Sequence, residues 1–120
     1  MLNWIENHEH LKQVQQKHKD FLMLAFYGAF SSAAERGLEE LKQFSEDNEE
    51  IPIYVIDVQK VKGIHKDFGI TTVPTVVSVE KGKITHRVEG VQSGRFYSRI
   101  FSGALVPQHT KSGKTRLSFI

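Results

Sequence analysis

The chain has 120 residues, a length that suits one compact domain and is too short for two domains that each bury a core. It contains no cysteine, which excludes disulfides, thiolate metal sites, iron–sulfur clusters and every cysteine nucleophile. The hydrophobic fraction of 39% and charged fraction of 25% are ordinary for a soluble globular domain, and no stretch has the length and apolarity to cross a bilayer. The N-terminal residues lack the basic region and apolar run of a secretory signal, so we expect a cytoplasmic protein with no membrane partner.

The charges are distributed unevenly along the chain. All 14 acidic residues lie at or before Glu89, whereas residues 90–120 carry five Lys and Arg residues and no acid. A basic end of this size can attract an acidic partner or nucleic acid, and it can equally be a solvated helix face followed by a tail. No basic motif interleaved with aromatic residues accompanies it, so we do not expect a nucleic-acid partner.

The first half of the chain alternates between helical and strand patterns. Residues 8–17 carry Leu11 and Val14 three positions apart among polar neighbours, which predicts a short amphipathic helix. Residues 21–27 form an unbroken apolar run, typical of a strand covered on both faces. A second helix is predicted to open at residues 31–35, because apolar residues then repeat at helical spacing (Ala34, Leu38, Leu41 and Phe44).

A second strand and a short helix follow. Residues 51–57 are apolar, with Pro52 tolerable only near the start of a strand. Residues 61–68 have apolar side chains at helical spacing and are followed by Gly69, the residue type that most readily ends a helix in a left-handed conformation.

The last part of the domain reads as a hairpin and a helix. Two segments rich in β-formers, 75–79 and 84–88, flank a turn in which Gly82 can supply a positive φ. Residues 92–101 have aromatic and apolar residues at helical spacing. The predicted order is therefore (β)αβαβαββα, an α/β three-layer sandwich with a mixed central sheet and helices on both faces. We expect residues 1–103 to form this domain and 104–120 to be a basic C-terminal tail.

Three segments resemble the thioredoxin family, over about residues 3–103. Residues 24–34, which end in Ser31-Ser-Ala-Ala34, are similar to the family's central strand and Cys-X-X-Cys motif. Residues 67–75, Asp-Phe-Gly-Ile-Thr-Thr-Val-Pro-Thr, are similar to its proline segment. The Lys81-Gly-Lys83 turn and the later Gly90 match its hairpin and loop glycines. The resemblance implies a thioredoxin-like fold.

The same resemblance shows which chemistry is missing. The motif positions are occupied by residues without a thiol: Ser31, Ser32, Ala33 and Ala34. A serine hydroxyl at a helix start stays neutral near pH 7 without a general base and cannot form a disulfide. The family's buried acid and its facing lysine fall on Ala25 and Ile53, so an ionisable pair is replaced by an apolar one. We therefore expect no dithiol redox activity and no catalytic residue.

The resemblance also implies a peptide-binding groove. It implies a cis Val73–Pro74 bond that turns the backbone of Val73 outward, so that its N–H and C=O can pair with an extended peptide. The implied groove residues are Phe30, Val73, Pro74, Thr75, Gly90 and Val91. A simpler alternative is that Pro74 only shapes the entrance to its strand.

Ser31 and Ser32 also have a structural explanation. A serine at an N-cap accepts from a backbone N–H of the first turn, and Ser32-Ala-Ala-Glu35 fits the capping-box pattern. The six histidines are scattered and show no metal spacing, so we expect neither a metal nor a cofactor.

The predicted function is a redox-inactive module that binds a protein or an extended peptide, in a chaperone-like or assembly role. Two alternatives stay open. The basic tail, with Leu117, Phe119 and Ile120, could dock the domain into a homo-oligomer or a larger complex. The chain could also be an enzyme remnant that uses Ser31 on glutathione or a related thiol.

Overall fold

The computed structural model describes residues 2–29 and 32–101, which form nine elements in one sheet with flanking helices. The elements are β1 (Asn3–Trp4), α1 (His8–Lys17), β2 (Leu22–Tyr27), α2 (Ser32–Asp47), β3 (Ile53–Asp57), α3 (Ile64–Asp67), β4 (Thr75–Glu80), β5 (Lys83–Glu89) and α4 (Gly94–Phe101). This order is the predicted (β)αβαβαββα, so the fold class is confirmed. The predicted tail, and with it the boundary at residue 103, lies outside the described residues.

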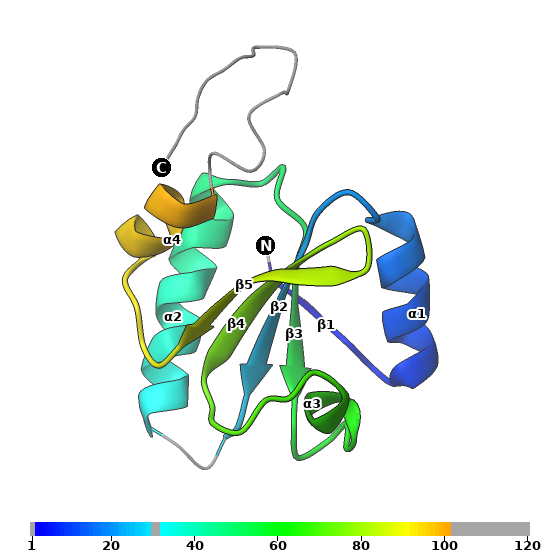
Figure 1. The fold of residues 1–120 in the computed structure, drawn as a ribbon. Helices are drawn as coiled ribbons and strands as arrows, with labels where there is room; N and C mark the ends of the chain where they lie inside the picture. The colour runs from blue at the N-terminus through cyan, green and yellow to red at the C-terminus, as the bar shows by residue number, and fades with distance from the viewer. Residues whose placement is uncertain (1, 30–31, 102–120) are drawn as a thin grey trace.

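The sheet is mixed, as predicted. Its strand order is β1-β3-β2-β4-β5; β1, β3 and β2 are parallel, β4 is antiparallel to β2, and β5 is antiparallel to β4. In Figure 1, α2 and α4 lie on one side of this sheet and α1 and α3 on the other. No helix of the described residues is long and apolar enough to span a membrane.

Two hydrophobic cores fill the spaces between the layers. Side chains of successive strand residues point to opposite faces, so β2 serves both cores. Met23, Ala25 and Tyr27 face α2 and α4, where Leu41, Phe44, Tyr97 and Phe101 meet them. Leu22, Leu24 and Phe26 face α1 and α3, where they pack with Leu11, Val14 and Ile64. All six residues of β2 are buried, which is why the sequence shows an unbroken apolar run there.

The element boundaries differ from the predicted ones by a few residues. β2 begins at Leu22 rather than residue 21, and β3 begins at Ile53 because Pro52 lacks the N–H that a ladder needs. The carbonyl of Pro52 still accepts from Met23 N at 3.0 Å. α3 is limited to Ile64–Asp67, and α4 begins at Gly94 rather than residue 92.

The β4–β5 turn is tighter than the sequence indicated. It consists of Lys81 and Gly82 alone, with φ of 53° and 82°. Two consecutive positive φ angles are the geometry of the turn that best matches strand twist in a two-residue hairpin. Gly69 also has a positive φ, 68°, directly after the short helix it was predicted to end.

Candidate functional site

The start of α2, which follows the end of β2, carries positions that resemble the family's Cys-X-X-Cys motif. Tyr27 is the last residue of β2, and α2 begins with Ser32, which is exposed; Ala33 is half-buried and Ala34 buried. Phe30 and Ser31 lie outside the described residues. Because α2 already includes Ser32, Ser32 is not the N-cap that a Ser32–Glu35 capping box requires. The Glu35 carboxylate accepts a hydrogen bond from the Tyr27 hydroxyl.

Ala25 and Ile53 occupy one hydrophobic core, on the face of the sheet that α2 covers. Their exposed fractions are 5% and 1%. Ala25 is paired with Val55 on β3 and with Val76 on β4, so it sits in the middle of the sheet. Their match to the family's acid and lysine remains a prediction, but both side chains are packed as ordinary core residues.

The predicted groove residues on β4 and after β5 are brought together. The Val73–Pro74 bond is cis, and Gly90 N donates to the Pro74 carbonyl at 2.8 Å. Thr75 is buried, and its hydroxyl donates to the Thr72 carbonyl at 2.7 Å. Gly90, at a φ of 85°, then leads the chain to Val91.

Gly37 lets α2 pack closely against this loop. A Cβ built on Gly37 would lie 3.0 Å from Pro74 Cγ, 3.3 Å from Pro74 Cβ and 3.9 Å from Val91 Cγ2. A contact of 3.0 Å is tighter than side chains normally tolerate, so the missing side chain is part of the fit. Pro74 and Val91 therefore lie together on the first half of α2.

Val73 has main-chain groups that no other described residue uses. Within residues 2–29 and 32–101, neither its N–H nor its C=O has a hydrogen-bond partner. Its side chain is half-buried against the core on the α1 side of the sheet. An unpaired donor and acceptor two residues before the start of β4 is an arrangement that strand addition can use.

A second group of polar and aromatic side chains lies on the other flank of α2. The Tyr27 hydroxyl donates to Glu35 Oε2 at 2.5 Å, and the Trp4 ring stands edge-on to the Tyr27 ring, with centroids 5.8 Å apart. Asp57 ends β3 directly beside Tyr27 in the sheet register. The hydrogen bond to Glu35 raises the pKa of Tyr27, and desolvation and the charges of Glu35 and Asp57 raise it further.

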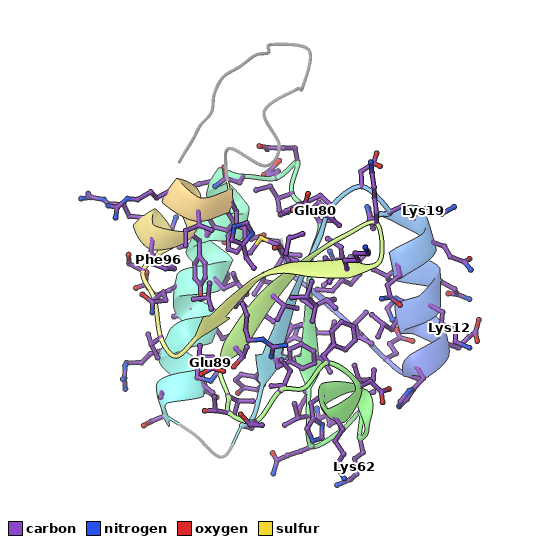
Figure 2. All side chains as sticks on the ribbon, viewed as in Figure 1. Lys12, Lys19, Lys62, Glu80, Glu89 and Phe96 are labelled. Carbon is purple, nitrogen blue, oxygen red and sulfur yellow. The ribbon has the colours of Figure 1, made fainter. Side chains whose placement is uncertain are left out.

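A hollow of about 600 Å³ lies at the opposite end of β2 from Pro74. It is lined by the end of α1 and by the hairpin turn, including Lys12, Lys19 and Lys81 around Leu22 and Val79. Figure 2 shows Lys12 on α1 and Lys19 just after its end, far from Phe96 of α4. Leu22 pairs with Val79 there, whereas Phe26 pairs with Thr75 at the Pro74 end, so the hollow and the Pro74 segment lie at opposite ends of the β2–β4 pair.

The class of protein follows from this arrangement: a five-stranded mixed sheet, a long helix after the central strand and a cis-proline at the start of the next strand define a thioredoxin-like fold. Solved thioredoxins share it at low sequence identity. A mutant thioredoxin from Halobacterium salinarum superposes with a TM-score of 0.77 at 19% identity, covering 88% of this chain and 94% of its own. Thioredoxin from Malassezia sympodialis gives 0.75 at 18%, covering 87% and 91%, and thioredoxin from Fasciola hepatica 0.75 at 14%, covering 83% and 97%.

The family model for thioredoxin matches residues 2–100, and the chain belongs to the thioredoxin family. A search of curated proteins found no match.

Sequence reasoning did not find the Trp4–Tyr27–Glu35 group or the role of Gly37. One signal was available for Trp4, because it is the chain's single tryptophan and stands in a short segment between Asn3 and Ile5-Glu6. Gly37 lies in the interior of a predicted helix, where glycine is unfavourable, and this is a hint of close packing.

Proposed function

We propose that this protein is a redox-inactive thioredoxin-family module that binds an extended segment of another protein at Val73–Thr75. The observation that carries the proposal is the unpaired N–H and C=O of Val73 in the described part of the chain. An added strand satisfies both groups, and net hydrogen bonds of this kind are worth about 1 kcal/mol each.

The surroundings of Val73 support this role. Pro74 and Val91 are both half-buried and pack on α2, so they offer apolar contact beside the unpaired backbone. The hydrogen bond from Gly90 to Pro74 holds the loop that follows β5 against the same backbone segment. A peptide laid along Val73–Thr75 therefore meets fixed groups and orders little of the protein on binding.

Thiol–disulfide exchange is not available to this chain, because that reaction needs a thiolate to attack and the chain has no cysteine. Binding is therefore proposed as the function itself, in an assembly or chaperone-like role. The two alternatives, docking of the tail into an oligomer and a thiol-binding site at Ser31, fall on residues outside the described part of the chain.

The test begins with linear peptides selected from a random library on the immobilised full-length chain. Their affinity is then measured in solution by fluorescence polarisation, for each peptide and for versions N-methylated at single amides. Strand addition predicts that methylation at one or two amides weakens binding by about tenfold or more, because it removes a main-chain hydrogen bond and adds a clash. Methylation at the other amides is expected to have little effect.

A pair of variants locates the site. Val73→Arg places a long charged side chain beside the backbone that is proposed to pair with the peptide, and is expected to weaken binding by about tenfold. Thr71→Arg adds the same charge two residues away at an exposed position and is expected to leave binding within about twofold. Equal affinity of the wild-type chain and Val73→Arg, or indifference to methylation at every amide, would contradict the proposal.

A further inference from the structure

Trp4 is an exposed aromatic side chain whose neighbours are organised. It is the only tryptophan of the chain and stands on β1, at the edge of the sheet. Its exposed fraction is 44%. A single exposed apolar residue needs no explanation by itself, so the inference depends on what lies beside it.

Beside Trp4, Tyr27 holds a carboxylate in place. The Trp4 ring contacts the Tyr27 ring nearly perpendicularly, at 86°, and the hydroxyl of Tyr27 donates to Glu35. This bond occupies one of the several acceptor positions of the carboxylate. Glu35 itself is exposed, so its remaining positions face solvent. One tyrosine thus links an accessible aromatic surface to an accessible, oriented carboxylate.

The local charge is negative and uncompensated in the described part of the chain. Asp57 adds a second carboxylate beside Tyr27; its Oδ1 accepts only from the backbone N–H groups of Gln59 and Lys60, at 2.9 and 3.4 Å. Neither Glu35 nor Asp57 forms an ion pair with a Lys, Arg or His of residues 2–29 and 32–101, although Arg36 and Lys60 are close in sequence. The charged groups that shift the pKa of the Tyr27 hydroxyl are the carboxylates of Glu35 and Asp57, and no basic group contributes.

We propose that Trp4, Tyr27 and Glu35 form a binding site for an arginine side chain of a protein partner. A guanidinium group stacks on an indole and donates two parallel hydrogen bonds to a carboxylate, so one arginine uses both parts of the site. Lysine, a compact and strongly hydrated cation, uses them less well. Nucleic acids and anionic membranes carry the same sign of charge as Glu35 and Asp57, so charge complementarity selects a basic protein. This site does not rest on strand pairing at Val73.

The chain supplies its own reporter, because all tryptophan fluorescence comes from Trp4. The full-length protein is titrated with an acetylated, amidated Gly-Gly-Arg-Gly-Gly peptide and with the same peptide carrying citrulline, which has nearly the shape of arginine without its charge. We expect a saturable fluorescence change with arginine and an affinity at least about tenfold lower with citrulline. The lysine peptide should bind more weakly than the arginine peptide, and free arginine amide tests whether the side chain alone suffices.

Two isosteric variants separate a site from general attraction. Glu35→Gln keeps an acceptor for Tyr27 but removes the charge, and should weaken arginine binding by about fivefold or more. Glu39→Gln removes the same charge one helical turn away on the exposed face, and should stay within about twofold. No saturable change with arginine up to about 10 mM, equal response to citrulline, or equal loss in both variants would overturn the inference.

Discussion

Gly37→Ala tests the close contact between α2 and Pro74. Gly37 lies well inside α2, where alanine is the better helix former by about 1 kcal/mol, so propensity alone predicts stabilisation. The new Cβ would, however, lie 3.0 Å from Pro74 Cγ and 3.3 Å from Pro74 Cβ. The Pro74 ring cannot easily retreat, because the Pro74 carbonyl is tied to Gly90 N and Thr75 follows it in a paired strand.

Inserting a carbon into packed surroundings costs about 1 to 3 kcal/mol. Against a gain of about 1 kcal/mol, we expect Gly37→Ala to lower the free energy of unfolding by about 1 kcal/mol. For a domain of this size that is a fall of roughly 4 to 8 °C in Tm. Because the clash displaces Pro74, the affinity for peptides selected on the wild-type chain should fall as well.

Gly94→Ala is the control without a clash. Its Cβ would meet Glu40 O at 3.5 Å and Phe44 N at 3.7 Å, which are ordinary contacts; because Gly94 is the first residue of α4, the gain from helix propensity should be positive but smaller than in a helix interior. Both variants are compared with the wild-type chain by urea and thermal unfolding followed by circular dichroism. If Gly37→Ala raises the stability as much as Gly94→Ala, the packing argument for Gly37 is wrong.

Three further outcomes follow from the packing, the turn and the titration of a buried tyrosine. Burial and then the charge of Glu40 raise the pKa of Tyr97 to about 12 from 10, so the folded state keeps a proton that the unfolded state loses. The contribution of this proton to the free energy of unfolding is fully present below pH 10, is lost as pH rises towards 12 and amounts to about 2 kcal/mol. Tyr97→Phe should therefore remove this part of the pH dependence of urea unfolding. Phe101→Ala, at a side chain with 0% exposure, should cost about 3 to 5 kcal/mol in the same assay, and a loss below 1 kcal/mol would contradict its place in the core. Gly82→Ala, at a φ of 82° with no atom within 4 Å, should cost about 1 kcal/mol through backbone conformation alone, and Gly82→Asn less.

The elements could be predicted because each has a pattern set by its own surroundings. α1 runs over the predicted residues, and its polar face and its two buried residues, Leu11 and Val14, follow the helical period. The short β1 strand, by contrast, has two residues, both exposed, and no periodicity could define it. Gly82 predicts the position of the hairpin turn correctly. The predicted turn is longer than the observed one, because Lys81 adopts a positive φ that its residue type does not predict.

The site was predicted only where it depends on a local motif. Pro74 and Gly90 could be identified because residues 67–75 and the glycine after the hairpin resemble segments of the thioredoxin family; proline restricts its own backbone and glycine permits a positive φ, so both residue types indicate a local backbone conformation. The bond between Tyr27 and Glu35 depends on how β2 meets α2, and the contact of Trp4 with Tyr27 depends on the parallel pairing of β1 with β3. Side chains that meet through the fold, rather than through sequence spacing, leave no periodic signal. The sequence pattern suggested a capping role for Glu35 because a capping box depends on residues close in sequence, whereas the hydrogen bond with Tyr27 depends on the fold.

The two proposed contacts lie on opposite flanks of the same helix, and this leads to a last prediction. Positions 35 and 37 of α2 are about 200° apart around the helix axis, so Glu35 and Gly37 face different sides. The sheet order agrees, since Trp4 is on β1 and Thr75 on β4, with β2 between them. A partner segment that pairs with Val73 and continues across the start of α2 can therefore place an arginine at Trp4.

Linking two weak contacts raises the effective concentration of the second, so the gain should depend on the spacing between them. Peptides that bind at Val73 are extended by an arginine after flexible linkers of increasing length. We expect affinity to pass through a maximum, about tenfold or more above the peptide without arginine, and Glu35→Gln to abolish that maximum while leaving the unextended peptide unaffected. A uniform gain at every linker length would mean that the added charge acts at long range, and the two surfaces would then have to be treated as independent.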